Sequence, residues 1–331
     1  MNAHSTPMAA TELAWAPLSY AQQRLWFFSR LAPQSSAYNL GGLLWLDGEL
    51  DRIALAAALD QLLARHGALR TVFAERDGVA MQALLPACAL ALEECDLTAL
   101  AGEQQEQEVR RQGRACVERP YDLGVGPLFR AVLYRLGAER QVLLIGMHHI
   151  VSDAWSVGVL LKELAECYAA HRQGRAPGLK ALPQTYGDYA ASQRQWLAGD
   201  EGRRQLDFWT RTLGREQPSP GLADDFPRQP RADRDAAYRT LQLQPGLVSA
   251  LRELGGSAGC TLFGVLLAAL QVQLSRLSGQ REVRIGVPVA GRSKERERLI
   301  GFFVNTLVLA ARPQPQLGVG DWLAQTKASL D

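Results

Sequence analysis

The stretch QVLLIGMHHIVSDAWS, residues 141–156, decides the fold class of this 331-residue chain. Its first seven residues are almost all apolar, which is typical of a strand buried on both faces. Beyond it, Leu160, Leu161 and Leu164 recur with helical spacing from Val157 onward. HHIVSDAWS is therefore a loop between a buried strand and the start of a helix, where α/β proteins commonly place chemistry.

The rest of the chain carries the same two kinds of pattern. Helical patterns cover residues 18–31, 53–65, 104–118, 184–213, 246–254 and 261–277, and a last helix begins near residue 321. Strand-like runs cover residues 71–75, 79–84, 128–136, 283–287 and 302–311. Asp77-Gly78 joins the first two runs and is a strong hairpin signal. Residues 217–234, rich in proline and charge, are expected to form an extended connection.

Composition excludes several classes of protein. The chain is 47% apolar and 21% charged, as a soluble globular protein is, and its formal charge of +2 does not favour nucleic acid or an anionic membrane as partners. The sequence lacks the pattern of a signal peptide, and its apolar stretches are too short for a membrane span. The five cysteines are scattered and fit neither a disulfide framework nor a metal site, so we expect a cytoplasmic protein.

Two adjacent histidines, His148 and His149, are the most informative feature. Neighbouring residues of a strand point to opposite faces, so we expect one histidine to be structural and the other to meet substrate. A metal site is not favoured, because adjacent histidines diverge and no third ligand has suitable spacing. From the residues alone, a buried structural histidine beside an Asp153 helix cap stays open as the alternative.

The string MHHIVSDAWS, residues 147–156, resembles the His-His-three-Asp-Gly signature of condensation domains of non-ribosomal peptide synthetases and of their acyltransferase relatives. Further segments resemble condensation-domain motifs in the right order: LSYAQQRLWFFSRL (18–31), RHGALRTVF (65–73), RPYDLGVGPLFRAVL (119–133), YGDYAASQRQWL (186–197) and IGFFVNTLVL (300–309). Within the family, SYAQQRLWFF resembles the subtype that joins an L-configured donor to an L-configured acceptor.

The resemblance implies an α/β fold of two chloramphenicol-acetyltransferase-like lobes, arranged as a V-shaped pseudo-dimer around a tunnel. A flexible lead would span residues 1–15, and the lobe with the histidine motif residues 16–178. The second lobe, residues 179–331, would be incomplete, because family members continue further.

The same resemblance implies peptide-bond formation between two thioesters. Upstream donor and downstream acceptor peptidyl carrier proteins would each deliver a phosphopantetheine arm, so the domain itself would bind no cofactor and no metal. A neighbouring adenylation domain is a further expected partner, and the domain is expected to be monomeric.

The resemblance also assigns roles to residues of the loop. His149 would take the proton of the attacking amine or orient that amine. His148 would belong to the scaffold, and Asp153 would form a buried pair with Arg70. Four residues would line the tunnel: Ala154, Trp155, Ser156 and Asn305. A core position for Trp155 and a structural role for Asn305 stay open as alternatives.

Ala154 departs from the family pattern, which usually has glycine at this position. If the backbone there needs a positive φ, alanine costs about 1 kcal/mol or somewhat more. If the position only needs a small side chain, alanine is the mildest replacement.

Three rival functions share parts of this pattern. An epimerisation domain usually places tryptophan after the serine of the motif, whereas Trp155 precedes Ser156 here. A stand-alone acyltransferase would not carry the other condensation-domain segments. A non-catalytic recruitment module would usually have lost part of the histidine motif, which this sequence retains.

Overall fold

The computed structural model describes residues 13–87, 89–215, 221–223 and 239–331. Most of the predicted extended connection at 217–234 and most of the predicted lead at 1–15 lie outside these residues. The end of that lead is different from the prediction, because Trp15 already belongs to a strand. The chain groups into two compact units, Met1–Arg204 with Ala290–Asn305, and Gln205–Val289 with Thr306–Asp331. The predicted lobe boundary after residue 178 does not coincide with this division.

The larger sheet of the first unit contains the buried strand that the sequence predicts. Its strands, in spatial order, are β2 (Asn39–Asp47), β7 (Arg140–His148), β6 (Phe129–Arg135) and β5 (Glu93–Asp96). Neighbours are antiparallel except β5 and β6, which are parallel. Every residue of β7 after the first is buried, so the prediction of a central strand is confirmed.

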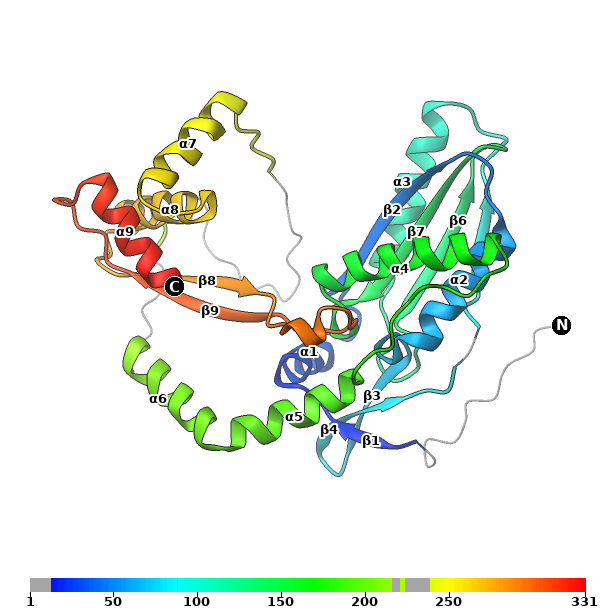
Figure 1. The fold of residues 1–331 in the computed structure, drawn as a ribbon, viewed down its shortest axis with the longest axis horizontal. Coiled ribbons are helices and arrows are strands. Elements are labelled where there is room, and N and C mark those ends of the chain that lie inside the picture. The colour runs from blue at the N-terminus through cyan, green and yellow to red at the C-terminus, as the bar shows by residue number, and fades with distance from the viewer. Residues whose placement is uncertain (1–12, 88, 216–220, 224–238) are drawn as a thin grey trace. The chain divides into compact units, whose positions relative to one another are not determined.

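Helices cover both faces of this sheet (Figure 1): α2 (Arg52–Arg65) and α4 (Ala154–Arg172) on one, α3 (Glu103–Glu118) on the other. Side chains of β7 alternate between the two cores. Leu143, Ile145 and Met147 pack with α2 and α4, whereas Val142 and Leu144 pack with α3. Alternation of this kind follows from the two-residue period of a strand.

A smaller sheet in the same unit has the order β1-β4-β3, with β1 (Trp15–Pro17), β4 (Val79–Leu84) and β3 (Thr71–Arg76). The predicted hairpin between β3 and β4 is confirmed. Asp77 and Gly78 at its turn have φ values of 50° and 75°, which the two-residue turn requires and which Asp and Gly tolerate.

Two more helices of the first unit, α1 (Tyr20–Leu31) and α5 (Tyr186–Ala198), frame the site described below. Helix α1 begins with a capping box in which the Ser19 hydroxyl accepts the Gln22 N–H and the Gln22 side chain returns to the Ser19 N–H. The predicted helical region 184–213 is divided into α5 and α6 (Asp200–Leu213), with Gly199 between them.

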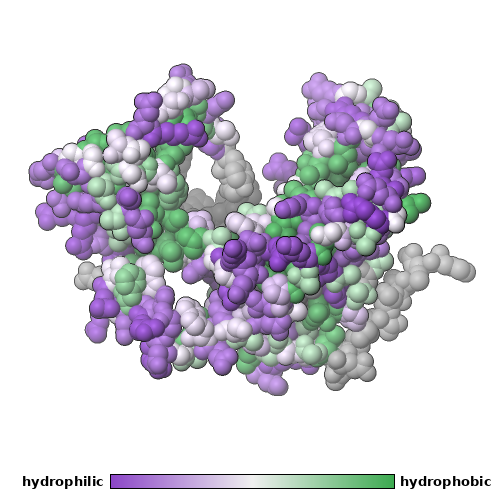
Figure 2. All heavy atoms as spheres, in the orientation of Figure 1, coloured by the Kyte–Doolittle hydropathy of each residue, from purple (hydrophilic) through white to green (hydrophobic). Residues whose placement is uncertain are grey.

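The second unit contains the helices and strands expected there: α7 (Pro245–Ser257), α8 (Leu262–Ser278), β8 (Val283–Val289), β9 (Asn305–Ala311) and α9 (Val319–Leu330). β8 pairs with β9, and a small core joins α8 to α9 through Val265, Ala268 and Leu323. Several apolar side chains of α8, including Phe263 and Leu266, are exposed, and Figure 2 shows apolar surface on the side where α7 and α8 lie.

Candidate active site

The two histidines lie at a sharp change of chain direction in the first unit. Strand β7 ends at His148, a short 3-10 turn covers His149–Val151, and α4 begins at Ala154. Asp153 caps α4, because its carboxylate accepts the Ser156 N–H at 2.8 Å. The helix therefore starts three residues earlier than the apolar pattern from Val157 predicts.

His148 is buried at the end of β7 and bonds the backbone of the turn that follows. It is 6% exposed, and its Nδ1 accepts the Ile150 N–H at 3.1 Å, so its side chain stabilises the turn. Burial, together with the neighbouring His149, lowers the pKa of His148 to about 4, and the imidazole is neutral at pH 7. Its ring meets Tyr121 edge-on at 6.1 Å, on the face of the sheet opposite to α4.

His149 is only partly buried, and its orientation is defined by two contacts. Its Nδ1 lies 2.7 Å from the Ser152 carbonyl oxygen. A carbonyl can only accept, so Nδ1 carries the proton, and Nε2 of the neutral ring is left as a hydrogen-bond acceptor. The ring of Phe302 packs against the imidazole at 4.8 Å, with 64° between the planes. His149 thus has the tautomer that a proton acceptor at Nε2 requires.

The buried ion pair of the loop joins Asp153 to Arg292, not to Arg70. Arg292 Nη2 lies 2.8 Å from Asp153 Oδ1, with both side chains 3% exposed or less. Arg70 instead donates to the carbonyls of Leu63, Ala64 and Leu85. It ends the 3-10 turn Gly67–Arg70 that follows α2, and its guanidinium reaches back to the carbonyls of Leu63 and Ala64 in the last turn of that helix. The expected pairing with Asp153 was therefore wrong, although a buried arginine partner exists.

Arg292 was missed by sequence reasoning. It donates to the Leu299 carbonyl at 2.6 Å and to the Arg296 carbonyl at 3.0 Å, and its guanidinium stacks on Phe303 at 4.1 Å. Burial lowers the pKa of Arg292, and the charge of Asp153 opposes that shift. Arginine titrates so far above neutral pH that the guanidinium stays charged. The arginine lies 139 residues from Asp153 in sequence, and only the tertiary fold brings the two together.

Ser156 is buried and lines neither of the two pockets described below, which differs from the prediction. Its side chain is fully buried, and its Oγ lies 2.8 Å from Asp153, 2.6 Å from Arg292 Nη2 and 2.9 Å from the Gly301 carbonyl. The Gly301 N–H donates to the same oxygen at 3.1 Å. Ser156 therefore joins the start of α4 to the returning segment 290–305.

Ala154 and Trp155 are exposed and line a surface pocket with Lys162, Lys180 and Arg298 among others. The Trp155 indole N–H donates to the Glu297 carbonyl at 2.8 Å. Asp77 is the one non-glycine residue with positive φ among the residues that the structure describes. Ala154 is therefore unstrained, and the motif glycine is not needed here for its backbone conformation.

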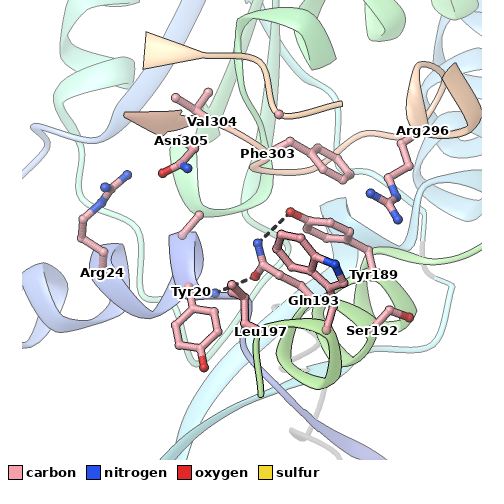
Figure 3. A pocket seen from close by; sticks show the side chains of 13 residues that line it. Tyr20, Arg24, Tyr189, Ser192, Gln193, Leu197, Arg296, Phe303, Val304 and Asn305 are labelled. Atoms are coloured by element: carbon pink, nitrogen blue, oxygen red, sulfur yellow. Dashed lines mark hydrogen bonds between the residues drawn. The ribbon is translucent and has the colours of Figure 1, made fainter. Parts of the chain in front are cut away.

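Asn305 lines a different pocket of about 640 Å³, formed by α1, α5 and the segment 290–305 (Figure 3). Gln193 lies at its floor, where its amide accepts the Tyr20 N–H at 3.0 Å and donates to the Tyr189 hydroxyl at 2.9 Å. Arg24 and Arg296 bring positive charge to this pocket. Three of the predicted tunnel residues, Ala154, Trp155 and Asn305, thus line two separate pockets, and neither pocket is lined by Ser156 or by His149.

Among the described residues, no group of three or more His, Cys, Asp and Glu side chains is arranged to hold a metal ion. Within the same residues, no individual helix has the length and hydropathy to cross a membrane; α7 and α8 satisfy that test only jointly, as a pair bent by 95°.

Comparison with known proteins gives the same family that the sequence of the histidine loop resembles. The family model described as "Condensation domain" matches residues 13–331. A linear gramicidin synthase from Brevibacillus parabrevis is 43% identical over 294 residues, which are 88% of this chain and 4% of that protein. A probable non-canonical non-ribosomal peptide synthetase, CymA from Salinispora arenicola, is 39% identical over 97% of this chain and 4% of its own length. The chain thus spans only a small part of these curated relatives.

The fold is shared with solved condensation domains. The first condensation domain of the calcium-dependent antibiotic synthetase, in complex with a substrate analogue, superimposes with a TM-score of 0.79 at 26% identity. The match covers 96% of this chain and 74% of that one. The expected chloramphenicol-acetyltransferase-like α/β fold is therefore confirmed, and the V-shaped arrangement around a tunnel stays a prediction. With its motif, its loop and its relatives in agreement, the chain belongs to the condensation domain family.

Proposed function

We propose that this domain forms an amide bond between two carrier-bound substrates in non-ribosomal peptide synthesis. The α-amine of an acceptor aminoacyl thioester attacks the carbonyl carbon of a donor acyl or peptidyl thioester. A C–N bond forms, the C–S bond breaks, and the donor thiol leaves with the proton that the amine gives up. Both substrates arrive on phosphopantetheine arms of carrier proteins, the upstream one as donor and the downstream one as acceptor.

One observation supports the proposal: the Ser152 carbonyl holds Nδ1 of His149 as a donor, so Nε2 is the ring nitrogen that can accept a proton from the amine. An α-amine has a pKa near 8, so much of it is protonated and unreactive at neutral pH. A neutral imidazole within hydrogen-bond reach can accept the proton, an effect typically worth about 10²- to 10⁴-fold in rate. Nε2 of His149 is the group that we assign to this role, as base or as orienting acceptor.

The surrounding polar groups support the same assignment by making the loop rigid. Ser152, whose carbonyl orients His149, is followed directly by Asp153, and that carboxylate is fixed by Arg292 and by the Phe303 N–H at 3.1 Å. Catalytic geometry must be held within a fraction of an ångström, and a buried, fully hydrogen-bonded neighbour provides this.

The test is an intact-mass assay on the longest natural protein that contains this chain. A donor carrier and an acceptor carrier are loaded, mixed with the protein, and weighed by mass spectrometry. The proposal predicts that the acceptor carrier gains the mass of the donor acyl group and that His149→Ala abolishes this gain. His171→Ala is the matched control, because His171 lies near the end of α4 and its side chain hydrogen-bonds only Gln61 among the described residues. Absence of transfer across several substrate pairs, despite measurable carrier binding, would instead favour a recruitment module.

Several finer assignments belong to the same proposal. The opening motif around α1 favours an L-configured donor and an L-configured acceptor. An adenylation domain supplies the acceptor carrier with its amino acid, and the domain acts as a monomer in the cytoplasm. The first three assignments follow from the sequence resemblance, and the cytoplasmic location follows from the scattered cysteines.

A further inference from the structure

Three consecutive residues opposite His149 have their backbone polar groups bound by side chains from elsewhere in the first unit. Ser156 holds the N–H and the carbonyl of Gly301, and Asp153 accepts the Phe303 N–H. The carbonyl between them, that of Phe302, accepts a hydrogen bond from the Tyr186 hydroxyl. The conformation of this segment is therefore set by side chains and not by a strand, and β9 begins only at Asn305.

The bond to Phe302 is the end of a buried chain of donors. The Ser19 hydroxyl lies 2.8 Å from the Tyr186 hydroxyl, and the same Ser19 oxygen accepts the Gln22 N–H. Because the Phe302 carbonyl can only accept, the Tyr186 proton points to it, and Ser19 donates to the Tyr186 oxygen. Burial raises the pKa of Tyr186, so the phenol stays protonated and remains a donor. Ser19, Tyr186 and Phe302 are all buried. Their hydrogen bonds connect the cap of α1 and the start of α5 to the backbone at residue 302.

The Tyr186 ring lies directly against that backbone. A β-carbon built on Gly301 would lie 2.0 Å from Cδ2 of Tyr186, so no side chain fits between them. The same ring packs edge-on against Phe303 at 5.0 Å. The Tyr186 ring thus limits how closely the backbone of residues 301–303 can approach it, and the Tyr186 hydroxyl fixes the direction of the Phe302 carbonyl.

Phe302 transmits this placement to the imidazole. Its side chain is 4% exposed and packs edge-on against His149 at 4.8 Å, on a ring whose only described hydrogen bond is that of Nδ1 to Ser152. A shift of the Phe302 backbone moves the Phe302 ring and leaves His149 free to rotate away from the Ser152 carbonyl.

We propose that Tyr186 is a positioning residue that acts through Phe302 to hold His149 in the orientation with Nε2 available. It touches neither substrate nor the reacting atoms. The consequence for turnover rests on the proposed function of His149, whereas the effect on the imidazole itself does not.

The first test reads the imidazole directly, without substrate. The chain has five histidines, so a protein labelled with nitrogen-15 histidine gives a simple set of ring signals, and His149→Ala assigns those of His149. In the unchanged protein, His149 should show one tautomer with the proton on Nδ1. Tyr186→Phe keeps the ring and removes the hydroxyl, and it should produce a second His149 tautomer or exchange broadening.

Tyr189→Phe is the matched control for this spectrum. Tyr189 lies one turn further along α5 and its hydroxyl bonds Gln193, so its removal should leave the His149 signals unchanged. Phe302→Leu removes the ring contact with His149 and leaves Tyr186 unchanged, so it should reproduce the effect of Tyr186→Phe on the His149 signals. If Tyr186→Phe or Phe302→Leu folds and leaves the His149 signals as they were, the proposal is overturned.

The second test measures turnover. Tyr186→Phe should lower kcat by about tenfold, less than the ~10²-fold that a 1 Å misplacement can cost, with little change in KM. If Tyr186→Phe changes the His149 signals but the unchanged protein forms no amide, the positioning role stands and the proposed function fails. If the His149 signals of Tyr186→Phe are unchanged and the unchanged protein forms the amide, the proposed function stands and the positioning role fails.

Discussion

Replacing Arg292 with methionine removes the only ion-pair partner that the described residues offer Asp153. Asp153 is 1% exposed. Its carboxylate would keep the hydrogen bonds from the N–H groups of Ser156 and Phe303 but lose its charge partner. Breaking a buried pair by removing one member costs about 3–5 kcal/mol. For a unit of this size, each kcal/mol lowers the melting temperature by about 2–4 °C, so we expect a fall of about 6–20 °C.

A double-mutant cycle identifies the partner of Asp153. Unfolding free energies by urea titration are compared for Asp153→Asn, Arg292→Met and both together, and residues in contact should show a coupling of about 0.5–3 kcal/mol. The same cycle with Arg70→Met is the control: Arg70 binds three carbonyls, so its loss destabilises the protein, but the effect should add to that of Asp153→Asn within about 0.5 kcal/mol. Additivity at Arg292, with coupling at Arg70, would refute the arrangement described here.

Three further predictions follow from single contacts. Ser156→Ala leaves the Gly301 N–H and carbonyl without their partner and should cost about 1–3 kcal/mol of stability, measured by urea unfolding, and an unchanged midpoint would contradict the role of this hydroxyl. Ala154→Gly should change stability by no more than ~1 kcal/mol and leave turnover nearly unchanged, because φ at this residue is not positive; a large gain in turnover would show that the motif glycine matters. Burial alone raises the pKa of Glu163, but hydrogen bonds from His66 and Arg65 outweigh it and lower that pKa. The stability that ionised Glu163 adds is therefore present at neutral pH and lost as pH falls through its lowered pKa. The difference in unfolding free energy between the unchanged protein and Glu163→Gln should therefore shrink as pH falls below the ordinary glutamate pKa of 4.5. A difference that stays constant below that pH would contradict this prediction.

The elements that the sequence predicted are those whose pattern is set locally. The apolar run of β7, the Asp-Gly turn of the hairpin and the helical spacing in α2 and α8 each depend on neighbours in the chain, and all are confirmed. β2 was missed because it contains Gly41 and Gly42, which weaken a strand pattern. Gly41 is needed there for packing, because a β-carbon would lie 2.2 Å from Val117 of α3, and that approach is a tertiary property.

The site was predicted only in part for the same reason. The two histidines diverge as expected, although His149 lies in the 3-10 turn after β7 and not on the strand: His148 bonds the Ile150 N–H and His149 packs against Phe302. The acid partner was assigned to the wrong arginine, because Arg70 and Arg292 look alike in sequence and differ only in what the fold brings near them. A usable signal for Arg292 was its place ten residues before Phe302, within a segment whose end resembles a family motif.

The most direct test of the central claim is the single-turnover rate of acyl transfer from a loaded donor carrier to a loaded acceptor carrier, compared between the unchanged protein and His149→Gln. The glutamine can accept a hydrogen bond but cannot take a proton. If Nε2 of His149 is the proton acceptor, the rate should fall by about 10²- to 10⁴-fold while the melting temperature and carrier binding are retained. A rate within a few-fold of the unchanged protein would contradict the account and leave alignment of the two substrates as the source of catalysis.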